Sequence, residues 1–247
     1  MSRIYFVSDL HIRDIQEQKA QTFLRFLLFI KQQPQPVTLI LGGDIFDLWL
    51  DSHKYFRDKF APLIDSIRDL IQNQHTVYYF EGNHDLHLKE YWEEQLGAKV
   101  YSGPEYFLFD KTIVRFEHGD QMNPEDHGYH FLRWFLRTPV LTFLIKNLPS
   151  GLVAYIGERA SGMSRHYTDG LRDEGRIKQM IHQHALRAFD ERAFDVFVHG
   201  HVHLQDEYIF ERQQKMVASI NLGSWDKSCR VLKLEHGVWN WESWDLI

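Results

Sequence analysis

Short apolar runs alternate with amphipathic segments over the first 80 residues of the chain. The runs at residues 4–7, 37–41 and 76–80 predict buried strands, because short apolar stretches bounded by turn residues are typical of strands. Residues 16–33 and 54–73 carry large apolar side chains at helical spacing, which predicts a helix between each pair of strands. This alternation predicts an α/β fold with parallel strands and crossover helices.

The pattern changes after the third predicted strand. It predicts a short helix at residues 87–96, strands at 99–101, 106–109, 112–116 and 194–198, a helix at 174–190, and four strands within 205–247. An aromatic, basic and helix-prone segment interrupts this arrangement between the strand at residues 112–116 and the helix at 174–190. We therefore expect a single domain, residues 1–247, with a helical insertion at about residues 123–173.

Two interpretations of the insertion remain open. Its apolar side chains, such as Phe131, Trp134, Phe135 and Leu141, form a stripe that is typical of a core or a dimer contact. Cationic side chains are interleaved with them, which suits a lid over an acylated phosphate at a membrane surface. These cationic residues are Arg133, Arg137, Lys146, Arg159 and Arg165.

Polar side chains gather at the predicted strand ends, where ligands bind in α/β sheets. Oxygen and imidazole donors without a thiolate suit a pair of divalent ions such as Mn²⁺, Fe²⁺ or Zn²⁺. Two such ions form a clamp for in-line displacement at phosphorus. The two ions must then share one carboxylate. Asp44 is the candidate, because the glycines before it let the backbone turn sharply and bring it close to the other ligands. The seven candidate ligands are Asp9, His11, Asp44, Asn83, His118, His201 and His203.

Composition narrows the function further. The chain has 247 residues, 44% of them hydrophobic, which is enough for a sizeable core. A formal net charge of −6 argues against nucleic acid as the main partner. Cys229 is the only cysteine, so no intramolecular disulfide can form.

The apolar segments predict a cytoplasmic protein. The first apolar run is too short for a secretory signal. The longest apolar region, residues 131–156, is interrupted by Pro139, Pro149 and three cationic residues, so it does not predict a membrane-spanning helix. Peripheral contact with the inner face of a membrane remains compatible with this segment.

Five motifs occur in a recognisable order. They are Asp-x-His at residues 9–11, Gly-Asp-x-x-Asp at 43–47, Gly-Asn-His-Asp at 82–85, His-Gly-Asp at 118–120 and Gly-His-x-His at 200–203. Together they resemble the motifs of the calcineurin-like metallophosphoesterases. The resemblance implies a two-sheet β-sandwich flanked by helices, with two metal ions at the strand ends.

The resemblance also implies a role for each motif residue. One ion would take Asp9, His11, Asp44 and His203, and the other would take Asp44, Asn83, His118 and His201. His84 would stabilise the transferring group or protonate the leaving oxygen, with Asp85 behind it to fix its orientation. Asp47 would be a supporting partner outside the ligand set.

Within this superfamily the chain resembles the UDP-2,3-diacylglucosamine hydrolases of lipid A biosynthesis. The resemblance rests on Gly-Asp-Ile-Phe-Asp-Leu-Trp at residues 43–49, on Asp126-x-x-Tyr129 after the histidine motif, and on the apolar insertion. It implies hydrolysis of the UDP-linked sugar lipid at its α-phosphate, with release of UMP and an acylated sugar 1-phosphate. The implied substrate contacts are Asn83, His84, Asp126, Ser164 and Arg165.

Two departures from that family keep alternatives open. Several members have arginine where this chain has His84, and Thr-His-Arg-Pro where it has Val202-His203-Leu204-Gln205. A histidine suits a poorer leaving group, so a phosphomonoesterase or phosphodiesterase acting on a nucleotide or another small substrate is the alternative. A third hypothesis is a non-catalytic scaffold that binds a partner through the insertion, although the complete set of candidate ligands argues against it.

Overall fold

Two β-sheets form the centre of the molecule in the computed structural model, which describes residues 3–50, 53–153, 155, 173–226 and 228–245. The first sheet has the order β13-β12-β1-β2-β4-β6, formed by Val238–Ser243, Arg230–Glu235, Arg3–Val7, Thr38–Leu41, Thr76–Phe80 and Lys99–Tyr101. The second has the order β10-β11-β9-β8-β7, formed by Asp206–Arg212, Lys215–Asn221, Val196–His199, Thr112–Glu117 and Glu105–Phe109.

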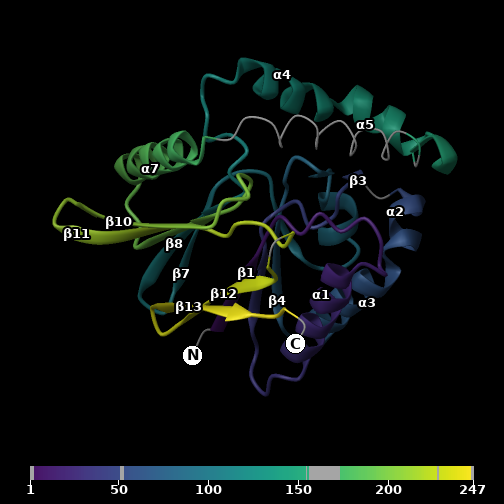
Figure 1. Cartoon of the computed structure of the whole chain (residues 1–247). Helices are drawn as coiled ribbons and strands as arrows, with labels where there is room; N and C mark the ends of the chain where they lie inside the picture. Colours follow the sequence, from purple (N-terminus) through teal and green to yellow (C-terminus); the bar gives the residue numbers. More distant parts are fainter. Residues whose placement is uncertain (1–2, 51–52, 154, 156–172, 227, 246–247) are drawn as a thin grey trace.

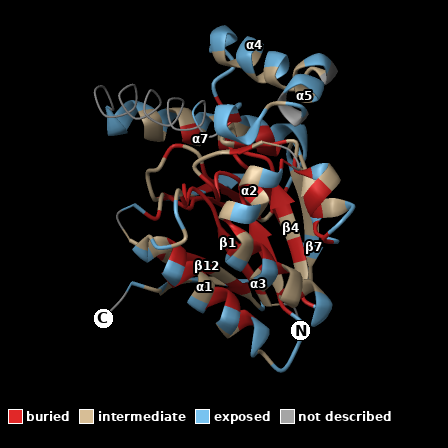
Figure 2. Ribbon diagram, turned by 90° about the vertical axis from the view of Figure 1, so that its right-hand side faces the viewer, coloured by how far each residue is buried: buried red, intermediate tan, exposed pale blue. Residues whose placement is uncertain are grey.

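The two sheets pack face to face around an apolar core. Side chains alternate along a strand, so Ile4 and Phe6 of β1 point towards the second sheet while Tyr5 and Val7 point away. Phe6 stacks on Phe116 of β8 with ring centroids 6.0 Å apart. Figure 2 shows the buried strands in the interior of the molecule. The expected two-sheet sandwich is confirmed.

Helices cover the outer faces of both sheets. On the first sheet lie α1 (Gln18–Lys31) and α3 (Ala61–Gln72), which bury apolar side chains against β1, β2 and β4. On the second lies α7 (Glu174–Glu191), which packs against β9 and β11. The order of layers is therefore helix, sheet, sheet, helix (Figure 1).

The direction of the strands collects their ends at one side of the sandwich. β1, β2 and β4 run parallel in the first sheet, and β8 and β9 run parallel in the second. The carboxyl ends of parallel strands meet at one edge of a sheet, so the loops that follow them can share one site. Within the predicted insertion, α4 (His127–Leu136) and α5 (Pro139–Lys146) lie along this side of the molecule (Figure 1).

Two sequence-based predictions of local structure are corrected. The helix expected at residues 54–73 is two helices, α2 (Lys54–Lys59) and α3, because Pro62 sits in the first turn of α3, where its missing N–H costs nothing. The segment expected as a short helix at 87–96 contains a π-helix, η1 (Lys89–Glu93). It is preceded by β5 (Asp85–Leu86), which pairs with β3 (Trp49–Leu50) in a short sheet that the sequence did not predict.

Candidate metal centre

The seven candidate ligands lie together, although they come from five loops. Each loop follows a strand, so the sheet order rather than the sequence separation decides which side chains meet. Asp9 and His11 follow β1, Asp44 follows β2, Asn83 follows β4, His118 follows β8, and His201 and His203 follow β9.

One group consists of Asp9, His11 and His203, whose candidate ligand atoms all lie within 4.8 Å of one another. The two imidazole Nε2 atoms face each other at 2.9 Å. His203 Nε2 lies 3.3 Å from Asp9 Oδ1, an oxygen that is buried and has no hydrogen-bond partner. A buried carboxylate oxygen without a donor is costly, and a cation would satisfy it.

A second group consists of Asp44, His118 and His201, again within 4.8 Å. Asn83 completes it, because its Oδ1 lies 3.0 Å from His201 Nδ1 and 3.3 Å from His118 Nε2. His118 Nδ1 donates to the Gly42 carbonyl at 2.8 Å, which leaves Nε2 to face the centre. A hydrogen bond on one ring nitrogen that fixes the other is common among metal-binding histidines.

Asp44 connects the two groups. Its Oδ2 lies 3.5 Å from His118 Nε2 on one side and 3.7 Å from His11 Nε2 on the other. Its Oδ1 accepts a hydrogen bond from the backbone N–H of His84 at 2.9 Å. One carboxylate is therefore within reach of both groups, which is the arrangement that a shared ligand of two ions requires.

The backbone of this centre is unusual. Five of the seven candidate ligands have a positive φ, between 46° for His11 and 72° for His201, and the others are Asp9, Asp44 and His203. Such conformations cost roughly 1–3 kcal/mol each and gather at functional sites. The loops also pass very close to one another: a Cβ on Gly82 would lie 2.1 Å from Asp44 Oδ1, so only glycine fits there.

The carboxylates of the centre are anionic at neutral pH. Burial would raise the pKa of Asp9, but the close approach of the His203 ring, followed by the charge of His118, outweighs burial and lowers that pKa to about 2. Burial opposes ionisation of Asp44 as well, yet the charge of His118 leads the effects that hold its pKa well below the usual range. Both carboxylates can therefore act as ligands without first losing a proton.

Two of the histidines are neutral at the same pH. Burial lowers the pKa of His11 to about 4, and burial together with the charge of His118 lowers that of His201 to about 4. His118 differs: burial lowers its pKa, but the charge and contact of Asp44 together with the charges of Asp9 and Asp120 outweigh burial and raise that pKa well above the usual value. A cation in place of that proton would be held by the same carboxylate.

The carboxylate of Asp85 binds groups other than the His84 ring. Its fully buried carboxylate accepts hydrogen bonds from the backbone N–H groups of Asp44, Ile45 and Gly82 and from the Tyr79 hydroxyl, at 2.7–3.0 Å. Burial and then the charge of Asp44 raise its pKa to about 6. Asp85 thus joins the loops after β2 and β4, and it is Asp47 that holds the His84 ring.

His84 lies at the edge of the centre. Its Nδ1 donates to the backbone carbonyl of Asp47 at 2.7 Å, and its ring meets that of His11 edge to face with centroids 4.7 Å apart. His84 also lies in a third group of possible ligands, with His11 and Asp44. Sequence reasoning gave it no ligand role, because the motif by itself does not reveal this proximity.

The insertion is held to the centre by charged contacts. Arg133 of α4 donates to Asp120 Oδ2 at 2.7 Å, and the Tyr129 hydroxyl donates to the same oxygen. Arg137 donates to Glu81 Oε2 at 3.1 Å. These contacts lie beside His118, because Asp120 and Glu81 follow β8 and β4. The acidic partners were not singled out from the sequence.

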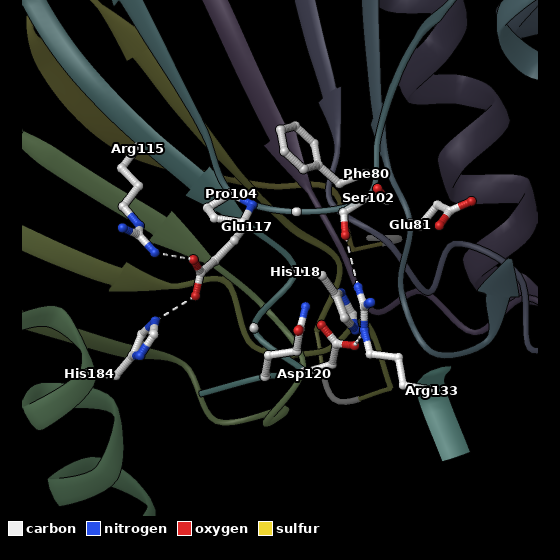
Figure 3. Close-up of a pocket in the computed structure, with 13 residues that line it drawn as sticks. Phe80, Glu81, Ser102, Pro104, Arg115, Glu117, His118, Asp120, Arg133 and His184 are labelled. Atoms are coloured by element: carbon white, nitrogen blue, oxygen red, sulfur yellow. Dashed lines mark hydrogen bonds and ion pairs between the residues drawn. The ribbon is translucent and has the colours of Figure 1, made fainter. Parts of the chain in front are cut away.

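A cavity of about 190 Å³ adjoins these contacts (Figure 3). Glu117 forms one wall and is bound at 2.5 Å by Arg115 and at 2.6 Å by His184 of α7. Arg133 closes part of the opposite side by reaching from Asp120 to the Ser102 carbonyl. Arg115, His184 and Arg133 each bind an acceptor at the wall of the cavity, although Arg115 Nε is buried without a hydrogen-bond partner.

His199 ends β9 on the face of the second sheet that α7 covers, with its ring 4.6 Å from that of Phe197. It is fully buried, and burial lowers its pKa to about 3. Asn221 Nδ2 lies 2.7 Å from His199 Nδ1 and donates to the Gly200 carbonyl at 2.8 Å. This pair therefore supports the turn that carries His201.

Large apolar side chains of α4 and α5 are exposed. Phe131 and Trp134 on α4 are 65% and 63% exposed, and Phe143 on α5 is 67% exposed. These three side chains therefore lie outside the core, and a dimer contact or a membrane contact stays a prediction. Asp126 caps α4 by accepting from the Tyr129 N–H at 2.9 Å. Ser164 and Arg165, the other predicted substrate contacts, lie outside the described residues.

Residues 2–206 match the family of calcineurin-like phosphoesterases. The chain belongs to this family, as its motifs indicated. It is 24% identical to a UDP-2,3-diacylglucosamine hydrolase of Ectopseudomonas mendocina, with 98% of each chain covered. It is 28% identical to one of Haemophilus influenzae, with 95% of this chain and 96% of that protein covered. A solved archaeal phosphodiesterase is 14% identical, with a TM-score of 0.49 and 98% and 99% of the chains covered.

No helix in the described part of the chain combines the length and the apolar character that a membrane-spanning helix needs.

Proposed function

We propose that this protein is a dinuclear-metal phosphoesterase that hydrolyses UDP-2,3-diacylglucosamine at its α-phosphate. The products would be UMP and 2,3-diacylglucosamine 1-phosphate, an intermediate of lipid A biosynthesis. The observation that carries the proposal is the pair of ligand groups that share Asp44. The near-complete coverage of curated UDP-2,3-diacylglucosamine hydrolases supports the choice of substrate.

The candidate ligands fit a pair of divalent ions. Asp9, His11, Asp44 and His203 would hold one ion, and Asp44, Asn83, His118 and His201 the other. Their oxygen and imidazole donors suit Mn²⁺, which we propose as the native metal, with Fe²⁺ or Zn²⁺ as alternatives. When bound, two such ions supply a Lewis-acid clamp for in-line displacement at phosphorus.

His84 would act on the leaving group. Its Nδ1 donates to a carbonyl, which can only accept, so the ring orientation is fixed and Nε2 remains for the substrate. A protonated Nε2 would donate to the oxygen that leaves phosphorus. Asn83 would contact the substrate as well as a metal, and Asp126, Ser164 and Arg165 are proposed contacts for the rest of it.

The insertion would serve as a lid and as a contact with the membrane. Its cationic residues Arg133 and Arg137 face the core, while its aromatic side chains face outwards. An amphipathic surface of this kind suits peripheral binding at the inner face of a membrane, where an acylated substrate resides. We therefore propose a cytoplasmic protein that associates peripherally with the inner membrane.

The experiment is a comparison of substrates with the Mn²⁺-supplemented protein. UMP release from the UDP-linked diacyl sugar is expected, and the Asp44→Ala variant is expected to abolish it. p-Nitrophenyl phosphate and its bis-ester serve as model substrates in parallel. Brisk turnover of a model ester without any UMP would reject the lipid substrate.

Turnover of a model ester without UMP release would favour a phosphomonoesterase or phosphodiesterase acting on a nucleotide or another small molecule. The presence of His84 supports this alternative, because a general acid matters most for a poor leaving group. A sugar phosphate leaves readily and gains less from such an acid.

A further inference from the structure

Arg13 and His84 both contact Asp47, although nothing in the motifs assigns Arg13 a role. The segments after β1 and β2 run side by side, because Asp47 N donates to the Ile12 carbonyl at 3.0 Å. Arg13 Nε lies 3.5 Å from Asp47 Oδ1, and His84 Nδ1 donates to the backbone carbonyl of the same aspartate. A guanidinium and the proposed general acid therefore flank one residue.

The guanidinium of Arg13 is not held by a tight ion pair. Its Nε is buried without a hydrogen-bond partner, and its side chain is 39% exposed. The two arginines of α4 and its C-terminal end, Arg133 and Arg137, are less exposed and donate to carboxylates at 2.7 and 3.1 Å. Of these three arginines, Arg13 can take an anionic ligand at the smallest cost in broken contacts.

The proposed reaction requires such a cation. A diphosphate substrate carries a second charged phosphoryl group next to the one under attack, on the side of the leaving oxygen. His84 marks that side of the centre, and Arg13 is connected to His84 through Asp47, which both residues contact. A planar guanidinium matches the oxygens of a phosphoryl group better than an ammonium does.

We propose that Arg13 binds the phosphoryl group that leaves with the sugar, and so selects diphosphates over single phosphoesters. This inference rests on the function proposed above. It makes Arg13 a substrate-binding residue that a substrate with one phosphoryl group does not use.

The first test compares two substrates in two Arg13 variants and a control. Arg13→Gln should lower kcat/KM for UMP release about tenfold or more, because a hydrogen bond to a charged group is lost. It should leave hydrolysis of bis-p-nitrophenyl phosphate within about twofold, since that ester has one phosphoryl group. Arg13→Lys should restore part of the loss. The matched control is Arg68→Gln on α3, an arginine that is 37% exposed and also ion-paired.

The second test measures binding and does not depend on turnover. Calorimetry of the Mn²⁺-loaded protein should show tighter binding of UDP than of UMP, and Arg13→Gln should remove that preference while Arg68→Gln keeps it. Chelation of Mn²⁺ by the nucleotides is the same for every variant in one buffer. A wild-type protein that releases no UMP would reject the proposed function, and the UDP preference would still decide the role of Arg13.

Two results would overturn the inference. One is an equal loss on both substrates in Arg13→Gln, which would indicate damage to the centre. The other is an unchanged preference for UDP in that variant, which would show that the second phosphoryl group lies elsewhere.

Discussion

His11 Nε2 and His203 Nε2 lie 2.9 Å apart, although the two residues are 192 positions apart in the sequence. One imidazole can donate a hydrogen bond to the other at this separation, and Asp9 lies within 3.9 Å of both nitrogens. A divalent cation bound between these groups would accept the lone pairs of both imidazoles and of the Asp9 carboxylate, which would make their close approach favourable.

Removal of divalent metal should therefore destabilise the folded protein. Free metal at 100 times its Kd contributes about 2.7 kcal/mol to the free energy of unfolding. For a chain of this size that corresponds to a shift of roughly 5–10 °C in Tm. Calorimetry of the chelator-treated protein before and after addition of Mn²⁺ measures it, with Mg²⁺ as a comparison. An unchanged Tm would argue against a metal centre.

Asp44→Ala should lower the metal content by more than one ion per chain, because its carboxylate is within reach of both groups. His203→Ala should remove only one, since His203 lies in one group. Elemental analysis after dialysis against trace metal gives the stoichiometry. Asp65→Ala, an exposed acid on α3, is the control and should keep the wild-type content. Equal loss in both active-centre variants would contradict a shared Asp44.

Asp85→Ala should destabilise the protein by roughly 3 kcal/mol or more, because it leaves buried donors without an acceptor. Three of these donors are backbone N–H groups that no rotamer change can redirect. Denaturant unfolding of the metal-free protein measures the loss. The exposed Asp69→Ala variant on α3 should change stability by less than about 1 kcal/mol. A stable but inactive Asp85→Ala would restore the catalytic role that the sequence suggested.

Substitution of His84 should slow hydrolysis more for poor leaving groups than for good ones. A general acid contributes about 10²–10⁴-fold when the leaving oxygen needs a proton. For His84→Ala, a series of substituted phenyl phosphodiesters should therefore give a steeper dependence of kcat on leaving-group pKa than the wild type. Parallel dependences in the two proteins would exclude proton donation by His84.

Replacing the exposed aromatic side chains of α4 should weaken binding to membranes. Phe131 and Trp134 expose apolar surface that a bilayer interface can bury. Co-sedimentation with vesicles containing anionic lipid should show less bound protein for Phe131→Ser/Trp134→Ser. The control is Leu28→Ser on α1. This leucine is 53% exposed, and α1 covers the outer face of the first sheet, away from α4. Equal binding by both variants would place the membrane contact elsewhere.

Cys229 should be unreactive in the folded protein at pH 8. Burial leads the effects that raise the pKa of its thiol to about 11, so the thiolate fraction falls about 100-fold below that of an ordinary thiol. Reaction with a disulfide reagent should be slow until denaturant unfolds the chain. Fast labelling of the native protein would contradict the buried position.

The sequence predicted the elements that carry the centre better than the contacts around it. The strands before Asp9, Asp44 and Asn83 are short apolar runs, which periodicity detects directly. The contacts of Asp85 were not predicted, because neighbours in sequence were expected to act together. Its carboxylate points instead to the loop after β2, a relationship set by tertiary structure.

The orientation of the insertion helices could not be predicted from the sequence either. Its aromatic spacing predicted helices but could not decide which face meets the core, because an apolar stripe looks the same on a core helix and on a membrane-facing one. The ion pairs of Arg133 and Arg137 decide it, and they depend on acids more than ten residues away in sequence.

The left-handed backbone at five candidate ligands limits how this centre can change during evolution. A mutation there must satisfy the backbone as well as the chemistry. Asparagine and glycine tolerate a positive φ, whereas valine and isoleucine do not. A descendant that lost catalysis but kept its fold should therefore carry asparagine or glycine at positions 9, 11, 44, 201 and 203. Inactive relatives could be recognised by that signature even where every motif has disappeared.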